Sequence, residues 1–182
     1  MTHTAESALK LLAEADLVCG ADEVRVAVQR VAQEIRASLS REFPLVLSVM
    51  SGAAVFTGQL LPLLEFPLEF SAIEATRYAN STQGREITWR LAPSENVRGR
   101  SILVIDDILD EGITLASIRS RLLEMGATRV LCAVFCDKDL GREKPIKADF
   151  VGVSVPNRYV FGFGMDAYGL WRNLPAVYAL RD

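Results

Sequence analysis

The sequence contains few of the residues on which the commonest catalytic centres depend. Among 182 residues there is one histidine, His3, close to the N-terminus, where we expect the chain to be frayed. A histidine-based zinc site and a Ser-His-Asp triad both need a histidine that the fold holds in place. The sequence therefore argues against both kinds of site.

Cysteine is also scarce. The three cysteines, Cys19, Cys132 and Cys136, are an odd number, and the last two lie in one apolar run without forming a CxxC motif. We therefore expect buried free thiols in a reducing cytosol.

Long apolar runs and a strong excess of one charge are missing too. No run approaches the ~20 apolar residues of a membrane span, and the N-terminus has no basic region followed by an apolar one. The formal net charge of -3 provides no broad basic field for nucleic acid. We expect a cytoplasmic protein without nucleic-acid or membrane partners, in which local groups hold any anionic ligand.

What the sequence does contain is an alternation of strand-like and helix-like segments. With 182 residues and 50% hydrophobic composition, the chain can bury one core but is short for two domains, so we expect a single domain spanning residues 1–182. The alternation predicts an α/β fold with a parallel sheet and helices on both sides. We expect helices near residues 6–18, 24–39, 53–64 and 115–125, and strands near residues 45–50, 66–75, 86–91, 102–105, 130–135 and 150–155.

The segment ILVIDDILDEGIT, residues 102–114, combines a buried strand with acidic residues at its carboxyl end. The amides of residues 111–114 open a helix and can converge on a phosphate, together with the hydroxyl of Thr114. Asp106 and Asp107 can accept hydrogen bonds from two ribose hydroxyls. The spacing suits a ribose 5-phosphate, although an acidic cluster after a strand can also simply solvate a loop and cap the next helix.

Two other kinds of nucleotide site lack support. No G-x-x-x-x-G-K run followed by Ser or Thr is present, so there is no Walker P-loop. Gly162, Gly164 and Gly169 lack the G-x-G-x-x-G spacing of a dinucleotide turn, and we assign them to tight backbone packing.

Residues 102–114 resemble the signature of the type I phosphoribosyltransferases. From residue 45 to Asn173 the chain resembles the hypoxanthine-guanine phosphoribosyltransferases, most closely the branch found in Gram-negative bacteria. The resemblance implies a mainly parallel twisted sheet flanked by helices. It also implies a small hood lobe, formed by the N-terminal segment and residues from about 150 to 182.

The resemblance assigns the acidic segment several roles. It implies that Asp106 and Asp107 hold the ribose and contribute to a Mg²⁺ site, and that Asp110 is the catalytic group that handles a proton at N7 of the base. The 5-phosphate would be bound by Asp110, Glu111, Gly112, Ile113 and Thr114.

Two further segments resemble the family's diphosphate loop and lid. VMSGAAVFTGQLL places Ser51 and Gly52 at the pyrophosphate, at a peptide bond that is often cis in relatives. ATRYANSTQGREITW resembles the lid that excludes water from the reacting centre, with Arg77 and Tyr78 in it.

The purine pocket is implied by two C-terminal segments. VFCDKDL places Lys138 at O6 of the base, where an ammonium, which only donates, suits a 6-oxopurine and opposes the amine of adenine. DFVGVSVPNRYVFGFGMDAYGLWRNLP supplies Tyr159 for stacking and Val160 for a backbone contact with the base. In the same segment, Asp166 would lie at the metal and the purine pocket, and Arg172 at the pyrophosphate.

The chain departs from the family pattern in two loops. Glu111 stands where threonine is usual, and a carboxylate about 4 Å from a phosphate would cost roughly 4 kcal/mol at an effective dielectric constant of about 20. Glu111 must therefore turn outward or pair with a basic side chain. In the diphosphate loop, SGAA replaces the usual Lys-Gly-Gly or Asn-Gly-Gly, which makes tight pyrophosphate binding less secure.

The resemblance implies a Mg²⁺-dependent enzyme of purine salvage that converts hypoxanthine or guanine to IMP or GMP, and a homo-oligomer, dimer or tetramer. Two alternatives differ in function. One is a regulator on the same fold that binds nucleotide or phosphoribosyl diphosphate without catalysis, and the other is a transferase for another base, such as xanthine.

Overall fold

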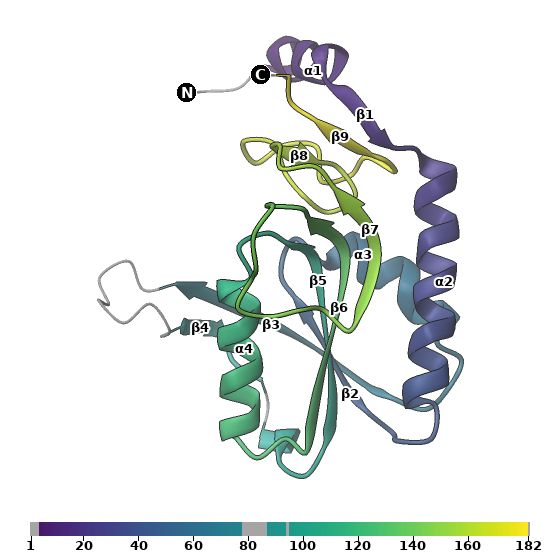
Figure 1. Ribbon diagram of the computed structural model, residues 1–182, viewed down its shortest axis with the longest axis vertical. Coiled ribbons are helices and arrows are strands. Elements are labelled where there is room, and N and C mark those ends of the chain that lie inside the picture. Colours follow the sequence, from purple (N-terminus) through teal and green to yellow (C-terminus); the bar gives the residue numbers. More distant parts are fainter. Residues whose placement is uncertain (1–3, 78–86, 94, 182) are drawn as a thin grey trace.

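The computed structural model describes residues 4–77, 87–93 and 95–181, which form two sheets and their flanking helices (Figure 1). The large sheet has six strands in the order β4-β3-β2-β5-β6-β7. The pairs β3-β2, β2-β5, β5-β6 and β6-β7 are parallel, whereas β4 at the edge is antiparallel to β3. The strands are β2 (Leu45–Val49), β3 (Glu69–Arg77), β4 (Ile87–Leu91), β5 (Ser101–Leu109), β6 (Arg129–Lys138) and β7 (Phe150–Val155).

Helices cover both faces of this sheet, as the alternation predicted. α2 (Ala21–Leu39) and α3 (Ala54–Leu60) contribute to one buried cluster, and α4 (Ile113–Glu124) contributes to another on the opposite face. In α2, apolar residues spaced three or four apart form a stripe that is buried against the sheet. Its members are Val24, Val28, Val31, Ile35 and Leu39.

The chain ends form a second, three-stranded sheet in the order β1-β9-β8, the hood that the resemblance implied. Its strands are β1 (Asp16–Cys19), β8 (Val160–Phe161) and β9 (Val177–Ala179). This sheet lies beyond the carboxyl ends of β5, β6 and β7 (Figure 1). One buried cluster continues from Phe135 of the large sheet to Phe163 and Val177 near and within the hood, so the two sheets share apolar packing.

Several element boundaries differ from the sequence prediction, and three of these differences have a clear physical reason. The first helix, α1 (Ala5–Glu14), ends before residues 15–18, and β1 begins at Asp16, because that segment pairs with β9, about 160 residues later in the chain. The strand expected at residues 102–105 continues to Leu109, since its polar end still pairs with β6. The helix expected at residues 53–64 ends at Leu60 and continues as a 3-10 turn containing Pro62.

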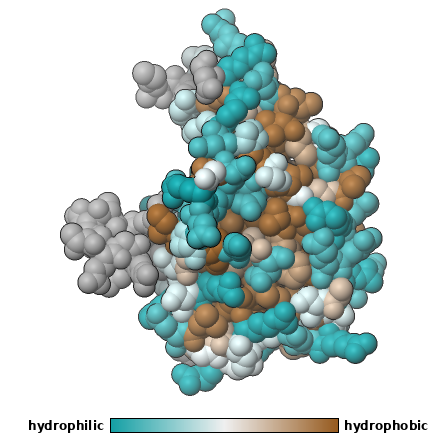
Figure 2. Space-filling view, in the orientation of Figure 1, coloured by the Kyte–Doolittle hydropathy of each residue, from teal (hydrophilic) through white to brown (hydrophobic). Residues whose placement is uncertain are grey.

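Polar side chains dominate the face shown in Figure 2, and the cysteine thiols lie in the interior. Hydrophilic side chains cover much of the face in Figure 2, while apolar side chains gather toward its middle.

All three cysteines are free and buried, as predicted. Burial raises the pKa of the Cys132 thiol to about 12, which keeps this side chain protonated and a poor nucleophile. Among the described helices, none is both long and apolar enough to cross a membrane.

Candidate functional site

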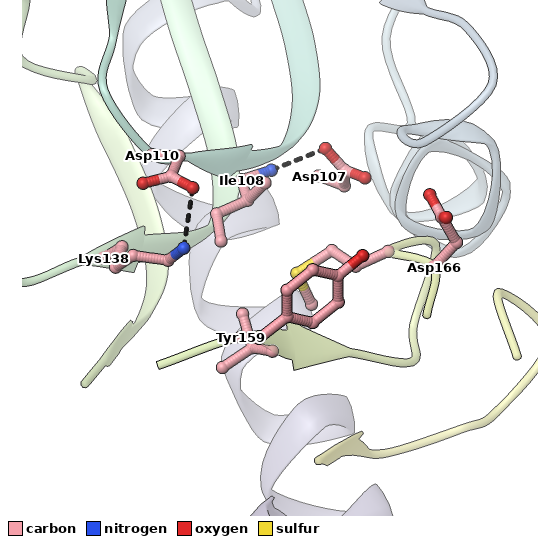
Figure 3. A pocket seen from close by; sticks show the side chains of 8 residues that line it. Asp107, Ile108, Asp110, Lys138, Tyr159 and Asp166 are labelled. Carbon is pink, nitrogen blue, oxygen red and sulfur yellow. Dashed lines mark hydrogen bonds and ion pairs between the residues drawn. The ribbon is translucent and has the colours of Figure 1, made fainter. Parts of the chain in front are cut away.

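The acid pair lies inside strand β5, on the side toward the hood. The backbone amide of Ile108 donates to Asp107 Oδ1 at 2.8 Å (Figure 3), and the amide of Asp107 donates to Asp106 Oδ1 at 3.0 Å. Burial and the neighbouring Asp107 carboxylate raise the pKa of Asp106 well above its usual value, and burial also raises the pKa of Asp107. Two adjacent carboxylates in such a place favour a cation or hydroxyl donors between them.

Asp110 and Lys138 meet across two neighbouring strands. Lys138 Nζ lies 2.6 Å from Asp110 Oδ2, with Asp110 just beyond the end of β5 and Lys138 at the end of β6 (Figure 3). The lysine side chain is 11% exposed and the aspartate side chain 48% exposed. The half-exposed carboxylate of Asp110 thus lies beside the mostly buried side chain of Lys138.

A cavity of about 230 Å³ opens between the large sheet and the hood. Asp107 and Asp110 come from the end of β5, Lys138 from β6, and Tyr159 and Asp166 from the C-terminal segment (Figure 3). Six predicted site residues thus reach one cavity. Its lining is Asp107, Ile108, Asp110, Lys138, Tyr159, Val160, Met165 and Asp166.

The predicted phosphate loop enters helix α4 through a left-handed residue. Gly112 is the N-cap of α4 with φ +77°, a conformation that favours glycine, and the helix begins at Ile113. The amides of the first turn of the helix have no partner within it, so Ile113 and Thr114 are placed as an anion-binding end requires. The Glu111 carboxylate pairs with Arg142, which is the second of the two alternatives that the sequence analysis gave for it.

The diphosphate loop approaches the acid pair closely. A Cβ on Gly52 would lie 2.1 Å from Asp107 Oδ2, and a Cβ on Gly164 would lie 2.1 Å from the Gly52 carbonyl oxygen. The backbone of this loop therefore touches both β5 and the C-terminal segment. The cis peptide bond is Met50-Ser51, one residue before the Ser51-Gly52 bond named from the resemblance.

The C-terminal segment brings an aromatic pair and an ion pair to the same region. Tyr159 is 48% exposed and stacks on Tyr168, with ring centroids 5.9 Å apart. Arg172 Nη2 lies 2.5 Å from Asp166 Oδ1, and Arg172 Nη1 donates to the Gly164 carbonyl at 2.6 Å. Arg172 is thereby fixed beside the loop that contains Gly52.

The three glycines assigned to tight packing divide into two groups. A Cβ on Gly162 would lie 2.2 Å from the Ala176 carbonyl oxygen, so Gly162, like Gly164, is confirmed in close packing. Among the described residues no heavy atom lies within 4 Å of a Cβ on Gly169, so packing is the wrong reason there. Gly169 instead has φ +84°, which a glycine adopts without strain.

The predicted lid is described only in part. Arg77 is the last residue of β3, paired in register with Ile87 of β4. Tyr78 and the loop after it lie outside the described residues, so its role at the reacting centre stays a prediction.

Four residues near the site were missed by the sequence analysis. Ile108 and Met165 are apolar walls of the cavity. From the connection between β6 and β7, Arg142 contacts Glu111 of the phosphate loop, and Lys144 contacts Leu109, just before that loop. Ile108 lies within the motif of residues 102–114, so its position in the sequence could have indicated that it lies at the site. Arg142 lies 31 residues from Glu111 and Lys144 lies 35 residues from Leu109, and no local pattern marks either contact.

Comparison with known proteins gives matches over most of the chain. The profile of the Phosphoribosyl transferase domain family matches residues 21–168. The chain is 33% identical over 161 residues to the hypoxanthine-guanine phosphoribosyltransferase of Bacillus subtilis (strain 168), which covers 88% of this chain and 89% of that protein. It is 29% identical over 162 residues to the hypoxanthine-guanine-xanthine phosphoribosyltransferase of Tritrichomonas foetus, covering 88% of each.

Solved structures give the same picture of the fold. A hypoxanthine-guanine-xanthine phosphoribosyltransferase superposes with a TM-score of 0.84 at 27% identity, covering 93% of this chain and 99% of that chain. A hypoxanthine-guanine phosphoribosyltransferase from Bacillus anthracis superposes with a TM-score of 0.84 at 23% identity, covering 91% and 98%.

Proposed function

The chain belongs to the phosphoribosyl transferase domain family, and on that premise we propose that it is a purine-salvage enzyme. It transfers the 5-phosphoribosyl group of 5-phosphoribosyl 1-diphosphate to N9 of hypoxanthine or guanine. The products are IMP or GMP and pyrophosphate.

The observation that carries this function is the contact between Asp110 and Lys138. In a 6-oxopurine, O6 and N7 lie next to each other on one edge of the base. An ammonium donates to O6, and a neighbouring carboxylate accepts a proton from N7. The two side chains therefore match this edge as a unit, whereas the amine of adenine would point a donor at Lys138.

The chemical step needs one proton acceptor. As N9 forms its bond to C1 of the ribose, the bond from C1 to the diphosphate oxygen breaks, and the proton on N7 passes to Asp110. Positive charge develops on the ribose ring during this exchange. We assign Asp106 and Asp107 to the ribose hydroxyls and to stabilisation of that charge; Asp107 lines the cavity, whereas Asp106 precedes it in β5 and is outside the lining.

Recognition of the other parts of the substrates falls to separate elements. We assign the 5-phosphate to Asp110, Glu111, Gly112, Ile113 and Thr114, with the first-turn amides of α4 as its main donors. Tyr159 and Val160 hold the base, and the apolar side chains of Ile108 and Met165 line its pocket. Ser51, Gly52 and Arg172 hold the pyrophosphate, which is supported by the hydrogen bond from Arg172 to the Gly164 carbonyl beside Gly52.

A divalent cation fits the acidic side of this cavity. Among the described residues no three histidine, cysteine, aspartate or glutamate side chains are grouped closely enough to hold a metal alone. Mg²⁺ in nucleotide sites usually binds one or two carboxylates plus substrate phosphates, and the paired carboxylates of Asp106 and Asp107 with Asp166 suit that arrangement. Bound there with the substrate, Mg²⁺ would neutralise charge on the diphosphate leaving group.

Compartment and assembly are further parts of the proposal. The three buried free thiols support a reducing, cytoplasmic setting. We also propose a homo-oligomer, dimer or tetramer, for which sedimentation or light scattering of the purified protein is the direct test.

A panel of bases tests the function. The purified protein is incubated with 5-phosphoribosyl 1-diphosphate, Mg²⁺ and hypoxanthine, guanine, xanthine, adenine or uracil, and nucleotide formation is followed spectrophotometrically. We expect turnover of hypoxanthine and guanine and rejection of adenine. Turnover of xanthine alone or uracil alone would contradict the proposal, and binding without turnover of any base would favour a regulator.

A further inference from the structure

The connection between β6 and β7 contains a lysine that the proposed chemistry does not use. Lys144 is 10% exposed, and its Nζ donates to the Leu109 carbonyl at 2.7 Å and to Asp137 Oδ1 at 2.6 Å. An ammonium has three donors, so two are occupied by these contacts. Lys144 lies outside the lining of the purine cavity, and its ammonium is held by the protein rather than offered to a substrate.

The two partners of Lys144 are neighbours of the two residues that read the purine edge. Leu109 immediately precedes Asp110, and Asp137 immediately precedes Lys138. Leu109 and Asp137 are also register partners, at the last pair of the parallel ladder between β5 and β6. The ladder between these strands ends at this pair. The ammonium of Lys144 bridges the two strand ends through its hydrogen bonds to Leu109 and Asp137.

Other contacts hold Lys144 in place. A Cβ on Gly112 would lie 3.5 Å from Lys144 Cβ and 3.2 Å from Ile146 Cγ2, so the loop packs directly on the turn into α4. Ile146 is buried in the cluster that contains Leu109 and Leu115. The loop packing therefore holds Lys144 in position, and its two hydrogen bonds come from a side chain that is only 10% exposed.

We infer that Lys144 is a positioning residue, which fixes the separation between the strand ends that carry Asp110 and Lys138. This inference rests on the proposed function. A fixed separation allows the carboxylate and the ammonium to meet N7 and O6 of one base simultaneously, and displacements near 1 Å at such a site cost up to about 100-fold in rate.

The test is the kinetic behaviour of Lys144→Met, with Lys147→Met as its matched control. Lys147 lies on the same loop and is exposed. A second variant, Lys144→Met combined with Asp137→Asn, removes the same bridge without leaving an unpaired carboxylate behind. The Michaelis constant KM for each substrate is the main readout, because it does not depend on the fraction of folded enzyme in a preparation.

We expect both Lys144 variants to raise KM for hypoxanthine and guanine about tenfold and to lower kcat. We expect KM for 5-phosphoribosyl 1-diphosphate to stay within about twofold, because the ammonium does not touch the first turn of α4. Lys147→Met should match the wild type.

Two results would overturn the inference: an unchanged KM for hypoxanthine in the double variant, or an equal rise in Lys147→Met. Absence of turnover by the wild-type protein would instead contradict the proposed function itself, so the two failures are distinguishable.

Discussion

Lys138 Nζ and Asp110 Oδ2 lie 2.6 Å apart, although 28 residues separate them in the sequence. Each belongs to the end of a different strand, and the parallel pairing of β5 with β6 brings the two ends together. Under the proposed function, this contact places the residue assigned to O6 beside the residue assigned to N7.

Replacement of Lys138 should weaken selection for 6-oxopurines. In Lys138→Met the O6 acceptor loses its charged donor, and we expect kcat/KM for hypoxanthine to fall about 100-fold while the discrimination against adenine shrinks. Steady-state kinetics with both bases measure this. An unchanged ratio of the two kcat/KM values would show that another group selects the base.

The contact between Glu111 and Arg142 predicts a charge effect on phosphate binding. Arg142→Gln releases a carboxylate next to the predicted phosphate cradle, and we expect KM for 5-phosphoribosyl 1-diphosphate to rise about tenfold through repulsion. Adding Glu111→Gln should restore the wild-type KM because the released charge is gone. A double variant as impaired as the single one would mean that Arg142 binds the substrate itself.

The close approach of Gly52 to Asp107 predicts that a methyl group there acts on the site. In Gly52→Ala the new Cβ would displace the Asp107 carboxylate, and we expect kcat to fall about tenfold with a small change in the thermal midpoint. Gly58→Ala is the control, since its Cβ meets no described heavy atom within 4 Å and alanine favours the helix α3. Equal activity of the two variants would contradict the placement of Asp107.

Asp166 should affect the dependence on metal. Asp166→Asn keeps an acceptor for the Gly169 amide but removes a negative charge, so we expect the Mg²⁺ concentration for half-maximal activity to rise about tenfold. Titration of activity with MgCl₂ after treatment with a chelator measures it. Wild-type behaviour of this variant would place the metal elsewhere.

The fold was predictable where structure depends on local pattern. The burial of Val24, Val28 and Ile35 follows from their three-four spacing, and the buried strand β2 follows from a continuous apolar run. β1 was missed because its four residues become a strand only by pairing with β9, which no window around Asp16 contains.

The candidate site was predictable by residue type but not by contact. Asp110 and Lys138 were each assigned from a motif, yet their meeting depends on the register of two strands. That Glu111 must turn outward or pair with a basic side chain followed from charge, while the pairing with Arg142 required the conformation of the loop between β6 and β7.

The most direct test of this account is the turnover of hypoxanthine by Asp110→Asn. The asparagine preserves size and a hydrogen-bonding oxygen but cannot accept the N7 proton at neutral pH. We predict that kcat falls about 100-fold to 10,000-fold, with KM for 5-phosphoribosyl 1-diphosphate near its wild-type value. Normal turnover of hypoxanthine and guanine by this variant would contradict the account.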